Sequence, residues 1–153
     1  MTERIFDRLW LQAAIDLSRR CPPSRRAYAV GAIIVAADGR ELARGYSRDG
    51  DPRIHAEQSA LAKLRIPHPD LVDATMYSSL EPCSIRKSDP ETCTELILSA
   101  GIRRVVLALR EPPILVDCQG VEILCGAGVE VIEIPDLAAE VRAINADLFA
   151  SNR

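Results

Sequence analysis

Two short fragments and one further thiol constrain this chain more than any other feature. His55 and Glu57 stand two positions apart, Cys83 follows in a Pro-Cys pair, and Cys93 comes after nine more residues. Together they supply an imidazole, two thiols and a carboxylate. A hydrolytic zinc site requires such a set: three protein ligands, an open position for water, and a group that transfers protons. We expect His55, Cys83 and Cys93 to bind Zn²⁺ and Glu57 to be the catalytic acid and base.

The spacing of these residues restricts where each one lies in the fold. In a regular helix the side chains of His55 and Glu57 would point roughly 200° away from each other. They share a site only if His55 stands at the very start of a helix. Cys93 follows Thr92, which is predicted to cap another helix, where the dipole favours a thiolate. Cys83 follows a predicted strand, so two helix starts and one strand end converge in the usual crevice of an open α/β sheet.

Apolar patterning predicts strands that alternate with helices. We expect helices at about 3–19, 54–65, 92–101, 119–126 and after Asp136, and strands at 29–36, 41–47, 75–79, 105–109 and 129–134. In the first helix an apolar face is formed by Phe6, Leu9, Trp10, Ala13, Ala14 and Leu17. Asp38-Gly39 indicates a hairpin, and the later alternation indicates parallel pairing. Residues 1–153 are therefore expected to form a single α/β domain, a three-layer α/β/α sandwich with a mixed, mostly five-stranded sheet.

Composition excludes several classes of protein. The net charge of −3 and the absence of a Lys/Arg block argue against a nucleic-acid partner. No apolar run approaches the ~20 residues of a membrane span, so no membrane contact is expected. The five cysteines, without a secretion signal, indicate thiols or metal ligands in a cytoplasmic protein. Four residues lack ligand-like spacing and are expected outside the site: His68, Cys21, Cys118 and Cys125.

The order of these motifs resembles the cytidine-deaminase-like superfamily, and within it most closely the deaminase domain of riboflavin biosynthesis. The likeness rests on His55-Ala56-Glu57, Leu80-Glu81-Pro82-Cys83-Ser84, the long gap before Cys93-Thr94, and the segment 100–106. The signature of zinc deaminases, H-x-E followed by P-C-x-x-C, is matched except for that gap. The resemblance implies a catalytic zinc, conversion of a ring amine to a carbonyl with release of ammonia, and a homodimer.

The substrate side departs from that family. Its S-P-N-P stretch is replaced by residues 25–28, where Ala27 lacks an amide, and Ser47 replaces a histidine. The segment from Cys83 to Cys93 is one residue longer, and no fused reductase domain is expected within the chain. The pattern predicts the same chemistry on a different small amino-heterocycle, with poor turnover of the riboflavin-pathway intermediate. The residues expected at the substrate are Ala56, Ser47, Ser79, Glu81 and Arg86.

Three alternatives remain at this point. The chain could be a true riboflavin-pathway deaminase, with Arg86 or Lys87 on the substrate phosphate, although this pair could equally be a solvated loop tip. It could deaminate bases in nucleic acid, against which the aromatic content of 4% argues. It could also be a non-catalytic zinc module, but such a site fills all four positions and no fourth ligand stands out.

Overall fold

A single mixed sheet forms the centre of the molecule. The structure of the chain is a computed structural model that describes residues 2–86 and 91–151. The strand order is β2-β1-β3-β4-β5. The strands span Gly31–Val35 (β1), Glu41–Tyr46 (β2), Thr75–Leu80 (β3), Arg104–Leu109 (β4) and Glu130–Glu133 (β5). β1 pairs antiparallel with β2 and β3, whereas β3, β4 and β5 are parallel. The predicted antiparallel edge and parallel second half are both confirmed.

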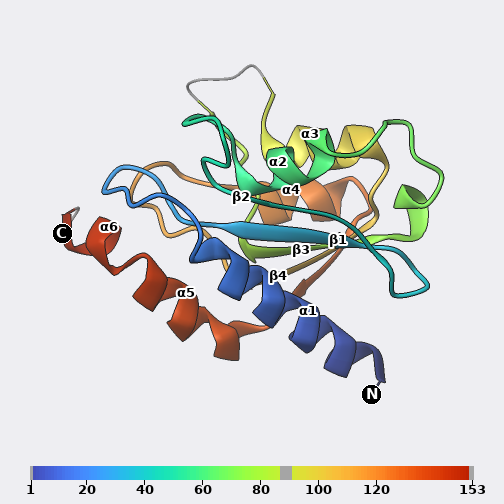
Figure 1. The fold of residues 1–153 in the computed structure, drawn as a ribbon, viewed down its shortest axis with the longest axis horizontal. Helices are drawn as coiled ribbons and strands as arrows, with labels where there is room; N and C mark the ends of the chain where they lie inside the picture. The colour runs from blue at the N-terminus through green and yellow to red at the C-terminus, as the bar shows by residue number, and fades with distance from the viewer. Residues whose placement is uncertain (1, 87–90, 152–153) are drawn as a thin grey trace.

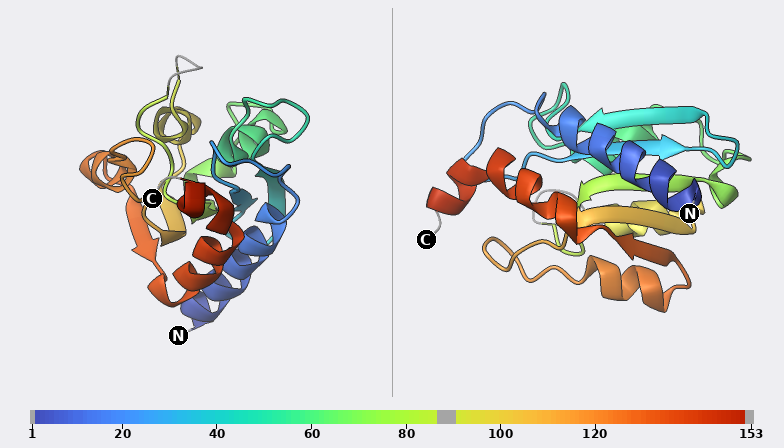
Figure 2. Two further views of the ribbon diagram at one scale, coloured as in Figure 1. Left: turned by 90° about the vertical axis from the view of Figure 1, so that its left-hand side faces the viewer. Right: turned by 90° about the horizontal axis from the view of Figure 1, so that it is seen from below.

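Helices cover both faces of this sheet (Figures 1 and 2). The helices span Thr2–Ser18 (α1), Ala56–Ala62 (α2), Cys93–Ala100 (α3), Gly120–Gly126 (α4), Ala138–Ile144 (α5) and Ala146–Ser151 (α6). Short 3₁₀ turns lie at Leu71–Asp73 and Pro135–Leu137. Figure 1 shows α2, α3 and α4 on one side of the sheet and α1, α5 and α6 on the other. The predicted three-layer α/β/α sandwich is confirmed.

Close packing of α2 against the sheet sets the position of the residues at the start of that helix. Gly45 on β2 has no side chain, and a Cβ there would lie 2.5 Å from the backbone nitrogen of Ala60 and 2.7 Å from the carbonyl oxygen of Ala56. Such distances are far inside van der Waals contact, so any larger residue would push α2 away from β2. Glycine at position 45 therefore lets the first turn of α2 lie directly over the sheet.

The apolar face predicted for α1 is wrong in part. Phe6 and Leu9 are 54% and 61% exposed, whereas Asp7 is only 2% exposed. The Arg104 guanidinium on β4 forms two hydrogen bonds with the Asp7 carboxylate, and this pairing turns a charged residue toward the sheet. Ala14 and Leu17 of the predicted face are buried, and the rest of the buried stripe consists of Asp7, Leu11, Ile15 and Ser18.

The C-terminal segment also differs from the single helix that the sequence predicts, because it is divided into α5 and α6 at Asn145. The Asn145 side chain accepts a hydrogen bond from the Ala29 nitrogen at 2.7 Å and donates one to the Val141 carbonyl at 2.9 Å. Asparagine thereby competes with regular helix bonding and ties the helix pair to the segment that enters β1. No helix in residues 2–86 and 91–151 combines the length and hydrophobicity that crossing a bilayer requires.

Candidate zinc centre and substrate cavity

Three ligand-type side chains meet where α2, α3 and the end of β3 approach one another. His55 is the N-cap of α2, with extended backbone angles of φ −89° and ψ 160°, so it stands before regular helix geometry begins. Cys83 follows β3, and Cys93 is the first residue of α3. Their ligand atoms all lie within 4.8 Å of one another. His55 Nδ1 is 3.4 Å from the Cys93 sulfur, and the Cys93 nitrogen donates to the Cys83 sulfur at 3.2 Å.

The local structure around Cys83 favours the form of cysteine that binds metal. The hydrogen bond from Cys93 lowers the pKa of the Cys83 thiol most, burial opposes it, and the neighbouring imidazole lowers it further. Thr92 caps α3 by accepting a hydrogen bond from the Glu95 nitrogen at 3.2 Å, which fixes the first turn that carries Cys93. A thiolate is the metal-binding state of cysteine, so the site is already arranged for a cation.

The donor set fits zinc with one position left for water. One imidazole nitrogen and two sulfurs are common zinc ligands, and catalytic sites use three protein ligands where structural sites use four. In the part of the chain that the structure describes, no fourth His, Cys, Asp or Glu joins this group. Glu57 is the second residue of α2, is 3% exposed, and accepts a hydrogen bond from the Ser78 hydroxyl at 2.6 Å. It therefore lies beside the three ligands without being one of them.

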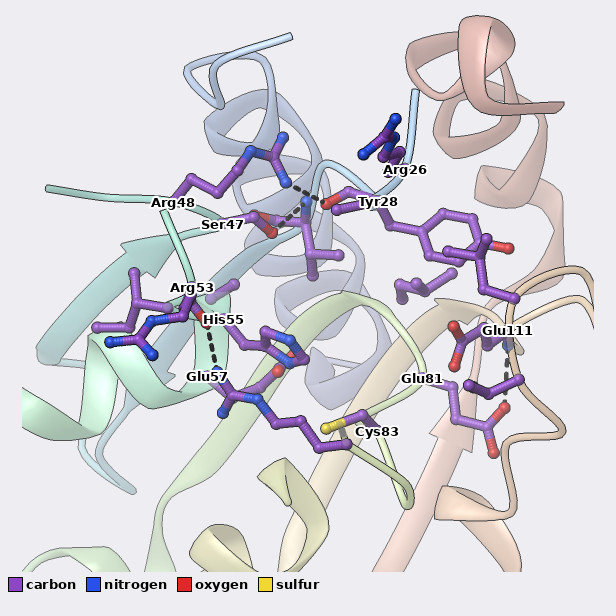
Figure 3. Close-up of a pocket in the computed structure, with 18 of the residues that line it drawn as sticks. Arg26, Tyr28, Ser47, Arg48, Arg53, His55, Glu57, Glu81, Cys83 and Glu111 are labelled. Atoms are coloured by element: carbon purple, nitrogen blue, oxygen red, sulfur yellow. Dashed lines mark hydrogen bonds between the residues drawn. The ribbon is translucent and has the colours of Figure 1, made fainter. Parts of the chain in front are cut away.

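A cavity of about 320 Å³ opens onto this group (Figure 3). Its wall combines two of the three ligand-type side chains, His55 and Cys83, and the carboxylate of Glu57 with charged residues of both signs. In Figure 3, Arg48 and Arg53 lie on one side of His55 and Glu57, and Glu111 and Glu81 lie on the other. The lining further includes Arg26, Ala27, Tyr28, Val30, Ser47, Ile54, Ala56, Leu80, Ile85, Arg86, Leu115 and Val116.

The residues that the sequence assigns to the substrate divide into two groups. Ala56 is fully buried and lines the cavity. Ser47 and Glu81 also line it, but their polar atoms already have backbone partners. The Ser47 hydroxyl accepts from the Val30 nitrogen at 3.0 Å. The Glu81 carboxylate accepts from the nitrogens of Glu111 and Val121 at 2.9 and 2.8 Å, which ties the loop after β4 and the start of α4 to β3.

Arg86 and Ser79 show a similar contrast. Arg86 lines the cavity, donates to the Gln58 side-chain oxygen at 2.8 Å, and also donates to the Arg53 carbonyl. Lys87, its predicted companion, lies outside the described residues. Ser79 is fully buried, but its hydroxyl accepts from the Gly31 nitrogen at 3.1 Å and it is not part of the cavity wall. Adjacent side chains of a strand point to opposite faces, so Ser79 points away from the face of β3 on which its neighbour Leu80 lines the cavity.

The residues that the sequence assigns to the substrate omit four charged residues of the wall: Arg26, Arg48, Arg53 and Glu111. Burial, with the negative groups at Cys83 and Glu81, raises the pKa of Glu111 to about 7. Arg48 has φ 62°, a left-handed conformation that is uncommon for a residue other than glycine. Its guanidinium donates to the carbonyls of Tyr28 and Pro22 at 3.2 and 2.6 Å. Glu111 could have been found, because it follows β4 as Cys83 follows β3, and parallel strands end at the same edge.

The residues expected outside the site lie in other surroundings. His68 accepts from the Asp70 nitrogen at 3.2 Å within a loop. The thiols of Cys21 and Cys118 donate to the carbonyls of Val30 and Pro82 at 3.4 and 3.3 Å. Cys125 is exposed. Within the described ranges, none of these four joins the group of ligand atoms around His55.

Comparison with known proteins agrees with this geometry. Residues 5–109 match the family model described as the cytidine and deoxycytidylate deaminase zinc-binding region. A diaminohydroxyphosphoribosylamino-pyrimidine deaminase of Schizosaccharomyces pombe is 40% identical over 126 residues, which are 81% of this chain and 31% of that protein. The cytosine deaminase of Candida albicans is 31% identical over 85% of this chain and 81% of its own length.

Solved structures give the same result. A diaminohydroxyphosphoribosylaminopyrimidine deaminase and 5-amino-6-(5-phosphoribosylamino)uracil reductase from Thermotoga maritima is 31% identical, with a TM-score of 0.79. The match covers 99% of this chain and 42% of that one, so the chain spans less than half of the bifunctional relative. The family match extends from α1 to the end of β4 and includes all three ligands and Glu57. This chain therefore belongs to the cytidine and deoxycytidylate deaminase zinc-binding family.

Proposed function

We propose that this chain hydrolyses the ring amine of an amino-pyrimidine that carries an anionic group, with release of ammonia. The observation that carries the proposal is the buried Glu57 carboxylate beside a three-donor zinc site, at the inner end of a cavity of about 320 Å³. A cavity of this size encloses a single heterocycle with a small substituent. Family membership supports the deamination chemistry, and the charges of the wall support the substrate class.

Each residue of the centre has a defined role in this proposal. His55, Cys83 and Cys93 would hold a Zn²⁺ ion, which would supply an activated water at neutral pH. Glu57 accepts a proton as the water oxygen attacks the amine-bearing carbon, and delivers that proton to the adjacent ring nitrogen. Glu57 then carries the second proton of the water to the amine. The carbon–nitrogen bond breaks, ammonia leaves, and the oxygen remains as the ring carbonyl.

The charge distribution of the wall orients the substrate. Arg26, Arg48 and Arg53 give the cavity positive charge on the side of the β2–α2 loop and the segment before β1. Guanidinium groups bind phosphate and carboxylate by paired hydrogen bonds. Glu111 lies on the other side, where a protonated carboxyl donates to a ring acceptor and an ionised one accepts from a ring N–H or amine. The anionic substituent is thus placed toward the arginines and the ring toward Glu111.

Paired substrates test the proposal directly. Ammonia release is measured for cytosine, deoxycytidine and deoxycytidylate, and for the diaminopyrimidine ribosyl phosphate with and without its phosphate. We expect the phosphorylated member of each pair to have the higher kcat/KM, and Arg53→Ala to reduce that preference more than it reduces turnover of the neutral member. Preference for free cytosine would contradict the anionic substrate class, and no ammonia from any compound would contradict the pyrimidine.

A second candidate within this class is the riboflavin-pathway intermediate itself, which the 40% identity to the S. pombe enzyme favours. The wall argues against it. Ala27 lines the cavity without a polar side chain, and the hydroxyl of Ser47 is bound to the Val30 backbone. A buried substrate group left without a partner costs about 1–3 kcal/mol. We expect kcat/KM below ~10⁴ M⁻¹s⁻¹ for the intermediate, whereas a value in the ordinary enzyme range would assign this pathway.

Four further points complete the proposal. Residues 1–153 act as one zinc-dependent deaminase domain, a homodimer is the working form, and the substrate is a small molecule instead of nucleic acid. A cytoplasmic location is supported by the five cysteines, none of which forms a disulfide. Light scattering coupled to size-exclusion chromatography tests the dimer, and a shift in electrophoretic mobility with single-stranded DNA or RNA would contradict the small-molecule class.

A further inference from the structure

The buried hydroxyl of Ser78 lies against the carboxylate that the proposed chemistry uses. Ser78 is on β3, in the middle of the sheet, where it is opposite Ala32 of β1 and Leu107 of β4 and is 0% exposed. Its oxygen is 2.6 Å from Glu57 Oε1 and 2.7 Å from the carbonyl oxygen of Leu80. Both distances lie within the ordinary range for hydroxyl hydrogen bonds, and a bond to an ionised acceptor is roughly twice as strong as one between neutral groups.

We propose that Ser78 is a positioning residue that holds Glu57 in its working orientation. The inference rests on the proposed function, because it takes Glu57 as the acid and base. A glutamate has three side-chain torsions, and the last is only weakly restricted. A hydroxyl bonded to Oε1 fixes that torsion and leaves Oε2 to serve the reacting atoms. Within the described ranges no Lys or Arg forms an ion pair with Glu57, so the fixed serine supplies orientation without neutralising the charge.

The second acceptor gives this contact a further property. A hydroxyl has one hydrogen, so Ser78 donates either to Glu57 or to the Leu80 carbonyl at any moment. The Ser78 oxygen thus lies between the Glu57 carboxylate and the backbone at the end of its own strand, which restricts the positions that the hydroxyl can take.

Three variants of the zinc-loaded protein test the inference. Ser78→Ala removes the hydroxyl, Ser78→Thr keeps it on a residue suited to strands, and Ser59→Ala is the matched control. Ser59 is also a buried serine whose hydroxyl donates to a carboxylate, that of Asp49 at 3.0 Å, but Asp49, unlike Glu57, does not line the cavity. Bound zinc and Tm are measured for each variant, with kcat and KM on the pyrimidine that the wild type turns over best.

We expect Ser78→Ala to lower kcat by about 10- to 100-fold, as for the loss of one hydrogen bond to a charged group. KM and zinc content should stay within twofold of wild type. Ser78→Thr should recover kcat to within a few-fold of wild type, and Ser59→Ala should leave it unchanged. A kcat for Ser78→Ala within twofold of wild type, or a Ser78→Thr enzyme of wild-type Tm as slow as Ser78→Ala, would overturn the inference.

A crystal structure of the zinc-loaded Ser78→Ala protein separates this inference from the proposed function. If no pyrimidine is turned over by the wild type, the substrate proposal fails, but the position of Glu57 still decides the role of Ser78. We expect the Glu57 carboxylate to rotate away from its wild-type position in Ser78→Ala and to keep it in Ser78→Thr. A carboxylate that is unmoved in Ser78→Ala would overturn the inference, whatever the activity.

Discussion

Neighbouring residues of β3 bind two buried carboxylates on opposite faces of the sheet. Tyr77 donates to Asp7 of α1 at 2.7 Å, and Ser78 donates to Glu57 of α2 at 2.6 Å. Both carboxylates are almost fully buried, at 2% and 3% exposure. They differ in what neutralises them. Arg104 binds both oxygens of Asp7 at 2.8 and 2.6 Å, whereas Glu57 lies beside the three side chains that could hold a metal ion.

The difference separates a structural carboxylate from one available for chemistry. Burial alone would raise the pKa of Asp7, but hydrogen bonds from Arg104 and Tyr77 lower it, and the net effect is a lowered pKa. Asp7 is therefore held as a charge that joins α1 to β3 and β4, and transferring a proton would break that pairing. Glu57 accepts a hydrogen bond from a neutral hydroxyl and, among the described residues, takes part in no ion pair with Lys or Arg.

The largest effect that this comparison predicts is loss of the metal from one face only. His55→Ala, Cys83→Ala and Cys93→Ala should each remove most of the bound zinc, since each deletes one of three ligands. Wild-type protein should hold about one zinc per chain, and Asp7→Asn should hold the same amount. Metal analysis of the purified variants measures this. Full zinc in Cys93→Ala would show that another residue is the third ligand.

The next effect is on turnover. Glu57→Gln keeps the shape of the side chain and removes its ability to carry a proton, so kcat should fall by about 10²- to 10⁴-fold. Zinc content and Tm should match wild type, because Glu57 is not among the ligands. Asp7→Asn, the same change on the other face, should leave the kcat of the folded enzyme unaltered. Zinc loss in Glu57→Gln, or near-normal turnover, would contradict the assigned role.

The same comparison shows what the sequence could reveal. The strand–helix alternation predicted the layer architecture, and the motif spacing predicted the convergence of His55, Cys83 and Cys93, since both are local signals. The orientation of α1 was not predictable, because it depends on Asp7 meeting Arg104, which is 97 residues away. Apolar residues occur on two stripes of that helix, and a tertiary ion pair selects which stripe is buried.

The cavity wall was harder to predict for related reasons. The sequence analysis assigned Ser79 to the substrate, but its neighbour Ser78 is the serine that contacts Glu57. Adjacent side chains of a strand point to opposite faces, and two serines in a row give no signal for which of them faces Glu57. Glu111 lies in a loop after β4, where periodicity carries no information and only the shared edge of the parallel strands points to it. Ser47 was assigned by its place in a motif, whereas its hydroxyl is committed to Val30, a partner 17 residues earlier that only the fold brings near.

A third prediction concerns the stability of the Asp7 face. Removing one partner of a buried ion pair costs about 3–5 kcal/mol, so Asp7→Ala should lower the free energy of unfolding by about 3 kcal/mol. Because the folded pKa of Asp7 is lowered, its contribution is present above the unfolded pKa of about 3.9 and is lost as pH falls through the folded value. Urea unfolding at pH 7 and pH 3 checks this: the variant should differ from wild type far more at pH 7. An equal difference at both values would contradict the ionised pairing.

The smallest effect sharpens the comparison with a third carboxylate, Glu111, on the zinc face. Its pKa is raised to about 7, chiefly by burial and then by the negative groups at Cys83 and Glu81. A raised folded pKa means that the folded state holds the proton more tightly than the unfolded state. The stability that this supplies is fully present below the unfolded pKa of about 4.3, and it is lost as pH rises through about 7.

Glu111→Gln stays neutral at every pH, so its free energy of unfolding should not show this decline between about pH 4.5 and 7. The difference from wild type is expected to be on the order of 1 kcal/mol, because Glu111 is partly exposed to solvent. Glu122→Gln, an exposed carboxylate that pairs with Arg110 on the same side of the sheet, is the control and should retain the wild-type slope. If Glu111→Gln and wild type decline in parallel across this range, burial does not hold a proton on Glu111, and its proposed contact with the substrate ring is that of an ordinary ionised acceptor.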